Sequence, residues 1–216
     1  MGMDRNPKKQ SKPLPAVVLG VCLLGGAAWF WDGVAKDRLI PKRWAAVEGH
    51  SIYRSGQLSA SLVKRTLARH GIKVIVALTF DDPQDKDQAA EVKAAAELGI
   101  ERLCFPLLGD GTGDVNNYVG AVAAVIQAER QGKPVLVHCA AGAQRTGGTI
   151  AFYQLLVDKR PPPAVIQELK QHGWKPKRNP KLLPYLNANL AKIAMALHDR
   201  GLLDEVPNPL PVLPVP

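Results

Sequence analysis

The sequence predicts an α/β fold in which helices flank a central, mainly parallel sheet, with a transmembrane helix added at the N-terminus. Short apolar, β-branched segments alternate with helical ones along the chain, and parallel strands need such helical crossovers. Of the 216 residues, 46% are hydrophobic and 22% charged, which is typical of one folded domain of ordinary size with extensions.

The N-terminus predicts a membrane anchor. Residues 1–13 form a basic flank, and residues 14–31 carry no charge over about the length that crosses a bilayer, roughly 20 residues. The bulky end of this segment, residues 29–31, suits a membrane interface, whereas the small residues 26–28 offer a cleavage site for a signal peptide. We expect an anchor, with cleavage as the alternative.

The orientation of this single-pass segment is not decided by its flanking charges. Four basic residues precede it and four follow it: Arg5, Lys8, Lys9, Lys12, and Lys36, Arg38, Lys42, Arg43. The short basic leader favours an exported domain. An unpaired reactive cysteine in that domain favours a reducing compartment.

The first part of the domain reads as a linker, a strand and a helix. Residues 32–49 are predicted to be a linker, and the domain is predicted over residues 50–200. Its first strand lies within "SIYRSGQ", and "SASLVKRTLARHG" follows as a helix with Ser59 as its N-cap.

The middle of the domain continues the alternation of strand and helix. "IKVIVAL" at 72–78 is a predicted buried strand, and the Ala- and Glu-rich 85–99 is a predicted helix ending at Gly99. "IERLCFP" is the next strand. A helix over 115–131 follows, with Asp114 able to cap it.

The last part of the domain begins with a strand over 135–139 and a glycine-bearing loop that leads into a helix ending near Val157. Two more helices are predicted in "PPAVIQELKQHG" and "NPKLLPYLNANLAKIAMALHDRG". Residues 201–216 are predicted to form a mobile tail, because "VPNPLPVLPVP" contains five prolines.

Charge and cysteine content limit the partners. A net charge of +9 suits a phosphorylated substrate or an anionic membrane surface. No basic motif is interleaved with aromatic residues, so we expect no nucleic-acid partner. The three cysteines lack metal-ligand spacing, so neither a metal site nor a cofactor is expected.

The stretch "VLVHCAAGAQRTGG", residues 135–148, carries the predicted site. Cys139 ends a strand where a loop enters a helix N-terminus, and that position directs backbone N–H groups and the positive end of the helix dipole at one point. These groups and Arg145 lower the pKa of the thiol. The same groups would hold a tetrahedral anion, which the arginine fork can grip through two oxygens.

The run from His138 through Cys139, five residues, Arg145, Thr146 and Gly147 resembles the signature of the cysteine-dependent protein tyrosine and dual-specificity phosphatases. The resemblance covers residues 50–175 and is greatest to compact bacterial and fungal members. Low-molecular-weight tyrosine phosphatases fit poorly, because their loop lies near the N-terminus.

The resemblance implies a phosphocysteine intermediate. Cys139 would attack phosphorus, Thr146 would ease the departure of sulfur, and His138 would orient the loop. The phosphate-binding residues would be those of the loop: Ala140, Ala141, Gly142, Ala143, Gln144 and Arg145.

The resemblance also implies an aspartate that protonates the leaving oxygen, on a mobile loop about thirty residues before the cysteine. "FPLLGDGTGD" offers Asp110 and Asp114; Asp81 and Asp82 lie much earlier. We favour Asp110, since Gly111 leaves its loop free to close and Asp114 is explained as a helix cap. The Trp-Pro-Asp triplet of classical members is absent.

The expected substrate is a phosphorylated protein or a membrane-proximal phosphate ester. The loop residues between Cys139 and Arg145 add no lysine, which argues against polyphosphates. Lys175, Lys177 and Arg178 either border the mouth of the site or form a solvated basic face. The alternatives are a lipid or inositol phosphate phosphatase, a rhodanese-like sulfur transferase and a non-catalytic phosphate-binding module. The sequence does not indicate an oligomeric state.

Overall fold

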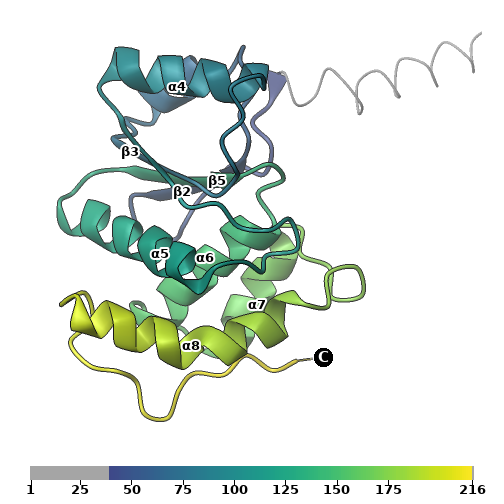
Figure 1. Cartoon of the computed structure of the whole chain (residues 1–216), viewed down its shortest axis with the longest axis vertical. Coiled ribbons are helices and arrows are strands. Elements are labelled where there is room, and N and C mark those ends of the chain that lie inside the picture. Colours follow the sequence, from purple (N-terminus) through teal and green to yellow (C-terminus); the bar gives the residue numbers. More distant parts are fainter. Residues whose placement is uncertain (1–38, 216) are drawn as a thin grey trace, which may run out of the picture. The chain divides into compact units, whose positions relative to one another are not determined.

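The computed structural model describes residues 39–215, which form a five-stranded sheet between layers of helices (Figure 1). The strands are β1 (Ala45–Ala46), β2 (Ile52–Gly56), β3 (Val74–Ala77), β4 (Glu101–Cys104) and β5 (Val135–Cys139). The helices are α3 (Val63–Arg69), α4 (Lys86–Leu98), α5 (Val115–Arg130), α6 (Gln144–Leu156), α7 (Pro162–Gln171) and α8 (Leu182–Asp199). The predicted α/β class is confirmed.

The sheet has the order β1-β2-β5-β3-β4, with β5 at its centre. The pairs β2–β5, β5–β3 and β3–β4 are parallel, and only β1 runs antiparallel to its neighbour. Gly56 on β2 lies opposite Cys139, and Ala77 on β3 lies opposite His138. The carboxyl ends of three parallel strands therefore meet around Cys139, where α/β sheets collect ligands.

Helices cover both faces of the sheet because the strands are apolar on both sides. α3 and α4 cover one face, where Ile75 and Leu136 pack with Leu67. α5 and α6 cover the other face, and α7 and α8 pack on these two helices (Figure 1). Strand neighbours alternate between the two layers, as a pleated strand requires.

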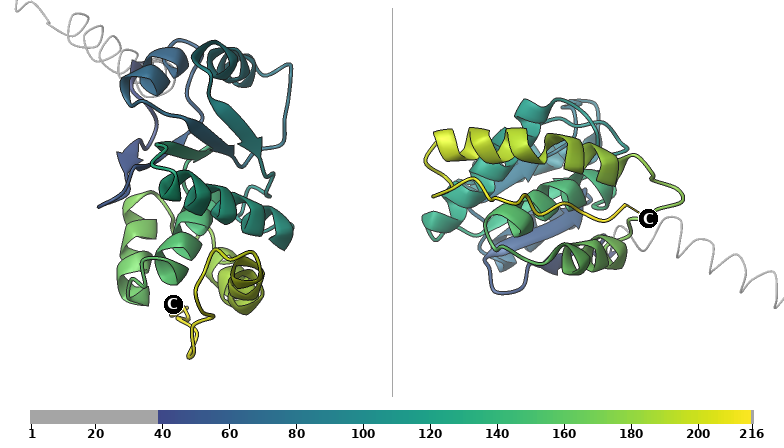
Figure 2. Two further views of the ribbon diagram at one scale, coloured as in Figure 1. Left: turned by 90° about the vertical axis from the view of Figure 1, so that its left-hand side faces the viewer. Right: turned by 90° about the horizontal axis from the view of Figure 1, so that it is seen from below.

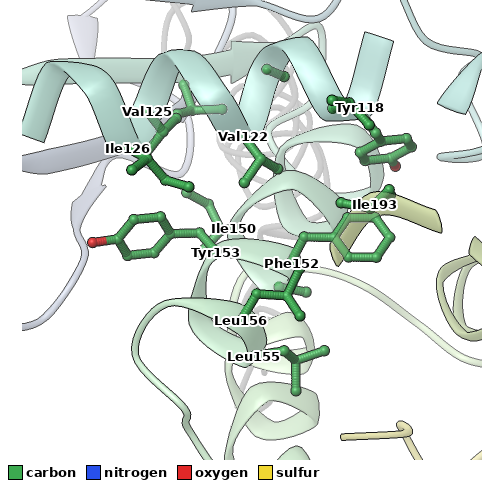
Figure 3. Packing of buried hydrophobic residues seen from close by; sticks show 14 of the residues in the cluster. Tyr118, Val122, Val125, Ile126, Ile150, Phe152, Tyr153, Leu155, Leu156 and Ile193 are labelled. Carbon is green, nitrogen blue, oxygen red and sulfur yellow. The ribbon is translucent and has the colours of Figure 1, made fainter. Parts of the chain in front are cut away.

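α6 forms the centre of the larger core. Every residue from Thr146 to Leu156 is buried, so the helix is enclosed on all sides. Figure 3 shows Phe152 and Leu156 of α6 near Val122 of α5 and Ile193 of α8. A helix enclosed in this way is held by packing rather than by its own propensity.

Two predicted boundaries near the start of the domain are wrong. Residues 32–49 are not only a linker, since β1 pairs with β2, Val47 is buried, and the Gly56 N–H donates to the Lys42 carbonyl at 2.8 Å. The helix predicted over 59–71 is shorter, and α3 starts after Leu62 without a side-chain cap. The Ser59 carbonyl instead closes a turn with the N–H groups of the residues that follow.

The helix caps predicted at Asp114 and Gly99 are confirmed. The Asp114 carboxylate accepts a hydrogen bond from the Asn116 N–H at 2.8 Å, and Gly99 ends α4 in the left-handed conformation at φ 63°. Asp85 caps α4 in the same way as Asp114 caps α5.

The prediction of a free, mobile tail is wrong for residues up to Leu213. The tail has no regular secondary structure, but it runs along α8 (Figure 2). The side-chain amide of Asn187 donates to the Leu213 carbonyl at 2.8 Å and accepts from the Leu213 N–H at 2.9 Å. Leu213 is 1% exposed. Burial of its apolar side chain therefore stabilises the tail on the domain, although the prolines keep the tail from forming regular secondary structure.

The predicted membrane segment, residues 14–31, lies outside the described residues. Among residues 39–215, no helix has the length and apolar character needed to cross a bilayer.

Candidate active site

The loop that follows β5 is shaped by a glycine. Cys139 is the last residue of β5, and α6 begins at Gln144, so residues 140–143 make the turn. Gly142 has φ 72°, and a Cβ placed there would lie 2.5 Å from the Gly56 nitrogen. No other residue fits both the backbone conformation and the available space.

Cys139 lies at the bottom of this loop and is 1% exposed. The Gly142 N–H donates to its sulfur at 3.2 Å. Burial raises the pKa of the Cys139 thiol, but the Thr146 hydroxyl, the Arg145 charge and the N–H groups of Thr146 and Gly142 lower the pKa by more, so the net shift is downward. The predicted direction is confirmed, and the thiolate is favoured.

The Thr146 hydroxyl is buried and has no partner within strict hydrogen-bond geometry. Of the groups that lower the pKa of Cys139, this hydroxyl has the largest influence, ahead of the Arg145 charge. This position fits the predicted role of Thr146, in which it stabilises sulfur as a leaving group.

Arg145 is held by two backbone carbonyls that lie beyond the carboxyl ends of β3 and β4. Its Nη1 donates to the Leu78 carbonyl at 3.3 Å, just beyond β3, and to the Leu107 carbonyl at 3.4 Å, beyond β4. Its Nε is buried and has no hydrogen-bond partner. The guanidinium is therefore held through Nη1, while its Nε–H remains available for an anion.

The loop carbonyls accept hydrogen bonds from β2, from the residue that follows it and from the segment before β1. Gln57 N–H donates to the Ala140 carbonyl at 3.3 Å, Arg43 Nη1 to Ala141 at 2.7 Å, and Arg54 Nη2 to Gly142 at 3.2 Å. Because each peptide is planar and its C=O and N–H point in opposite directions, the next three N–H groups face away from these donors. The loop can thus present a row of N–H groups to one anion.

Arg54 is a supporting residue that the motif does not indicate. It is 1% exposed, and its Nη1 lies 3.0 Å from Glu168 on α7. Burial lowers the pKa of Arg54, and the Glu168 carboxylate opposes this shift. A single arginine within the predicted strand "SIYRSG" is the only sequence signal for this role.

His138 contacts a buried carboxylate on α4. Its Nε2 lies 3.0 Å from Oε2 of Glu91, although the angles do not fit a hydrogen bond, and both side chains are at most 1% exposed. Burial raises the pKa of Glu91, but His138 and Arg102 lower that pKa by more. The net result is a pKa of about 2. The contact ties the start of the loop to α4, which fits the predicted orienting role of His138.

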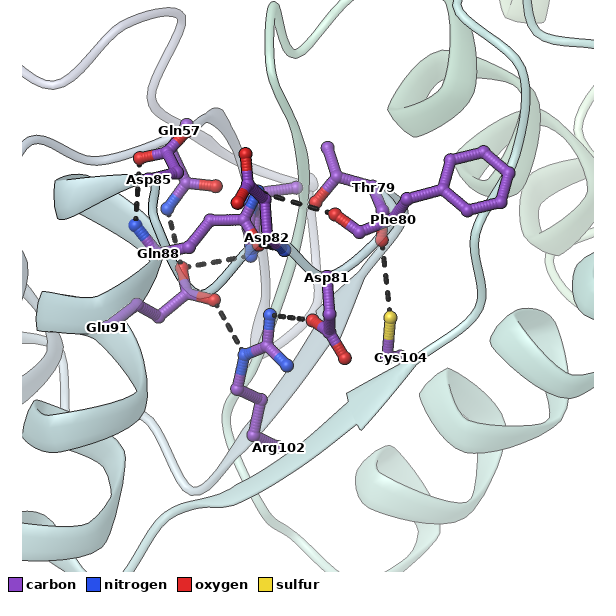
Figure 4. Close-up of polar contacts among 11 residues, drawn as sticks. Gln57, Thr79, Phe80, Asp81, Asp82, Asp85, Gln88, Glu91, Arg102 and Cys104 are labelled. Atoms are coloured by element: carbon purple, nitrogen blue, oxygen red, sulfur yellow. Dashed lines mark hydrogen bonds and ion pairs between the residues drawn. The ribbon is translucent and has the colours of Figure 1, made fainter.

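The Glu91 carboxylate is shared among several donors (Figure 4). It accepts from Gln57 Nε2 at 3.1 Å and from Arg102 Nε at 2.9 Å, and Arg102 Nη2 lies 3.0 Å from Asp81. Asp81 is therefore part of this structural network. Glu91 resembles any other glutamate of an Ala- and Glu-rich helix, so sequence reasoning missed it.

Asp110 lies on the loop that precedes α5, next to the phosphate loop. A Cβ on Gly111 would lie 3.3 Å from the Gln144 Cβ, and the Tyr118 hydroxyl donates to the Gly111 carbonyl at 2.6 Å. These contacts place the predicted acid loop against the start of α6.

The Asp110 carboxylate is 33% exposed and is held by three donors. It accepts from the Thr112 hydroxyl at 2.7 Å and the Thr112 N–H at 3.1 Å, and it lies 3.2 Å from Lys181 Nζ. The Thr112 groups and Lys181 lower the pKa of Asp110. In this arrangement the carboxylate is ionised, so an acid role requires these contacts to break.

Other candidate groups lie apart from Cys139. Cys104 donates from its thiol to the Thr79 carbonyl at 3.2 Å, and burial raises its pKa. Lys175, Lys177 and Arg178 line a separate cavity whose walls do not include Cys139. Within residues 39–215, no three His, Cys, Asp or Glu side chains are grouped as metal ligands.

Comparisons with known proteins match this arrangement. A family described as "Swiss Army Knife protein, DSP-PTPase phosphatase domain" matches residues 56–187. Dual specificity protein phosphatase TpbA of Pseudomonas aeruginosa is 31% identical over 180 residues, covering 79% of this chain and 76% of TpbA. Dual specificity protein phosphatase OPG106 of vaccinia virus is 39% identical over 65 residues, covering 30% of this chain and 38% of OPG106.

Two solved structures share the fold at low identity. A variant of P. aeruginosa TpbA in complex with phosphotyrosine is 22% identical, with a TM-score of 0.55, and covers 75% of this chain and 99% of that one. The catalytic core of the PP-IP phosphatase SIW14 from S. cerevisiae, in complex with citrate, is 20% identical, with a TM-score of 0.58, and covers 76% and 96%.

Proposed function

The chain belongs to the DSP-PTPase phosphatase family and is a cysteine-dependent phosphatase, and from that premise we propose that it dephosphorylates phosphotyrosine in proteins. The observation that carries the chemistry is the buried Cys139, whose sulfur accepts the Gly142 N–H and whose pKa is lowered by Thr146 and Arg145 despite its burial. A thiolate in a ring of donors is the nucleophile that this reaction needs.

In the first step, the Cys139 sulfur attacks phosphorus and the bond to the ester oxygen breaks. The equatorial oxygens gain charge in the transition state, where the loop N–H groups and the free Arg145 Nε–H stabilise them. Asp110 takes up a proton from water once Thr112 and Lys181 no longer hold its pKa down, and it donates this proton to the leaving oxygen. For this, Asp110 gives up its contacts with Thr112 and Lys181 as substrate binds.

In the second step, water attacks phosphorus and the bond from phosphorus to sulfur breaks. The Asp110 carboxylate takes the proton of the water, and the Thr146 hydroxyl stabilises the departing thiolate. Inorganic phosphate leaves, and Cys139 is again a thiolate.

The choice of a phosphoprotein over a polyphosphate rests on the loop. Its side chains are Ala140, Ala141, Ala143 and Gln144, so Arg145 is the only cation that the loop itself brings to the phosphate. A ligand with several phosphates would need further cations close by. The complex of TpbA with phosphotyrosine supports the same substrate class.

A substrate panel tests this proposal. The full chain is assayed for phosphate release from phosphotyrosine and phosphoserine peptides, an inositol polyphosphate and a lipid phosphate, with Cys139→Ser as the inactive control. We expect the highest kcat/KM on phosphotyrosine peptides. A higher kcat/KM on the inositol or lipid phosphate would overturn the substrate class while leaving the phosphatase chemistry intact.

We further propose that residues 14–31 anchor the enzyme as a single-pass membrane protein, with the catalytic domain on the exported side. The uncharged run and its basic leader support this proposal. Protease accessibility of the domain in sealed spheroplasts tests the orientation. Cleavage near residue 28 in the mature protein would contradict the anchor.

A further inference from the structure

A cavity of about 920 Å³ lies between the connection from α7 to α8 and the C-terminal tail. Its apolar part includes Trp174 and Leu183, which are at most 2% exposed, and Val215 from the tail. Its charged part consists of Lys170, Lys175, Lys177 and Arg178. We call it the basic cavity; no acidic residue lines it.

The connection that carries these cations is held in a fixed shape. Trp174 Nε1 donates to the Asn179 carbonyl at 3.1 Å, and the N–H groups of Arg178 and Asn179 donate to the Lys175 carbonyl at 3.0 and 2.9 Å. The basic side chains therefore extend from a closed turn. A backbone held in this way loses less conformational entropy on binding than a free loop would.

The four cations have no partner within the domain. Across residues 39–215, none of them forms an ion pair with a carboxylate. Several like charges that gather around an apolar cavity repel one another, and an anionic ligand relieves this repulsion. The complementary ligand combines negative charge with an apolar group.

The same segment borders the predicted acid loop. Lys181, just after the basic connection, lies 3.2 Å from Asp110, and the Leu182 side chain lies 2.6 Å from where a Cβ on Gly111 would be. Lys181 and Leu182 therefore contact the acid loop, and their neighbours in the chain on either side line the basic cavity. A peptide whose phosphorylated residue enters at Cys139 can extend along this segment.

We propose that the basic cavity binds an acidic segment next to the phosphorylated residue of a protein substrate, with an apolar side chain of that segment inside it. The inference rests on the proposed phosphoprotein activity and specifies the substrate sequence. Its position beside the acid loop favours a peptide that continues from the active site over a separate lipid surface.

Matched peptides and matched variants test the inference. Two phosphotyrosine peptides are compared, each with one leucine near the phosphotyrosine. Three residues that flank the phosphotyrosine are glutamates in the first peptide and glutamines in the second. The full chain is compared with Lys175→Gln/Lys177→Gln/Arg178→Gln. The control, Arg65→Gln/Lys86→Gln/Lys93→Gln, removes equal charge from exposed positions on α3 and α4.

We expect the cavity variant to raise KM for the acidic peptide about tenfold, the scale of three solvent-exposed ion pairs, and by less at high salt. In the cavity variant, KM for the glutamine peptide and turnover of an aryl phosphate should stay unchanged. In the control variant, KM for both peptides and turnover of the aryl phosphate should all stay unchanged. Equal KM values for the two peptides in the wild-type chain would overturn the inference while the aryl phosphate still reports an active phosphatase. No turnover of the aryl phosphate would instead overturn the proposed function.

A vesicle measurement separates the peptide from a lipid. The same variants are mixed with vesicles of phosphatidylcholine, with and without phosphatidylserine. An unchanged difference between the two vesicle types supports the peptide site. Loss of that difference in the cavity variant, with normal peptide KM, would overturn it in favour of an anionic membrane surface.

Discussion

The phosphate loop and the acid loop lie against each other, but different contacts hold them. The phosphate loop is fixed by buried groups, with Arg54 on its Gly142 carbonyl and backbone packed against Gly142. The acid loop shares one buried contact, from the Tyr118 hydroxyl to the Gly111 carbonyl, but its Asp110 carboxylate is held by Thr112 and by an ion pair with Lys181, which is 72% exposed. Buried contacts hold one geometry, whereas exposed ones can break as substrate binds.

The largest expected effect is at the nucleophile. Cys139→Ser should lower kcat at least about 10⁴-fold, because a hydroxyl in the same place is not ionised. Phosphotyrosine binding should persist, since the loop N–H groups and Arg145 remain. Calorimetry with a phosphotyrosine peptide measures the binding, and turnover within tenfold of wild type would rule out Cys139 as nucleophile.

Glycine substitutions in the two loops test their difference in rigidity. Gly142→Ala should lower kcat/KM by more than about 100-fold, because its Cβ would force the phosphate loop away from Ser55 and Gly56. Gly109→Ala in the acid loop meets nothing within 4 Å and should have little effect. Similar losses in both variants would show that the acid loop is equally constrained.

Asp110→Asn tests the acid loop in catalysis. It should slow turnover of phenyl phosphate by roughly 100-fold, the usual scale for acid catalysis, and slow a nitrophenyl ester much less, since that leaving group needs less protonation. Asp114→Asn is the control, because it only weakens the cap of α5. The same leaving-group dependence in both variants would remove Asp110 from the mechanism.

The smallest expected effect concerns the Lys181 ion pair. Thr112 and, to a smaller extent, Lys181 lower the pKa of Asp110, so Lys181→Met should raise that pKa slightly and keep the acid protonated to higher pH. The basic limb of kcat/KM for phenyl phosphate should move upward by less than about one pH unit. Lys159→Met, which removes an exposed ion pair with Glu205, should leave the profile in place. A downward shift in Lys181→Met would contradict this role.

The sequence predicted what lies close together along the chain. Cys139, Arg145 and Thr146 belong to one strand, loop and helix, so the motif placed them, and the alternation of strands and helices placed the parallel sheet around them. Arg54, Glu91 and Lys181 reach the site from distant elements, and each has an ordinary local pattern. Their partners follow only from how the helices pack on the sheet.

The tail shows the same limit. Its prolines indicated an irregular segment, which is what the structure has. That Leu213 would be buried beside α8 depends on how the tail packs on the domain, which no local pattern encodes.

The burial of α6 has a consequence for how this enzyme fails on heating. Since Arg145 and Thr146 belong to the most enclosed helix among residues 39–215, we expect these two catalytic residues to keep their place until the core unfolds. Thermal inactivation should therefore coincide with loss of far-ultraviolet circular dichroism, and the amides of this helix should exchange with deuterium only as fast as whole molecules unfold.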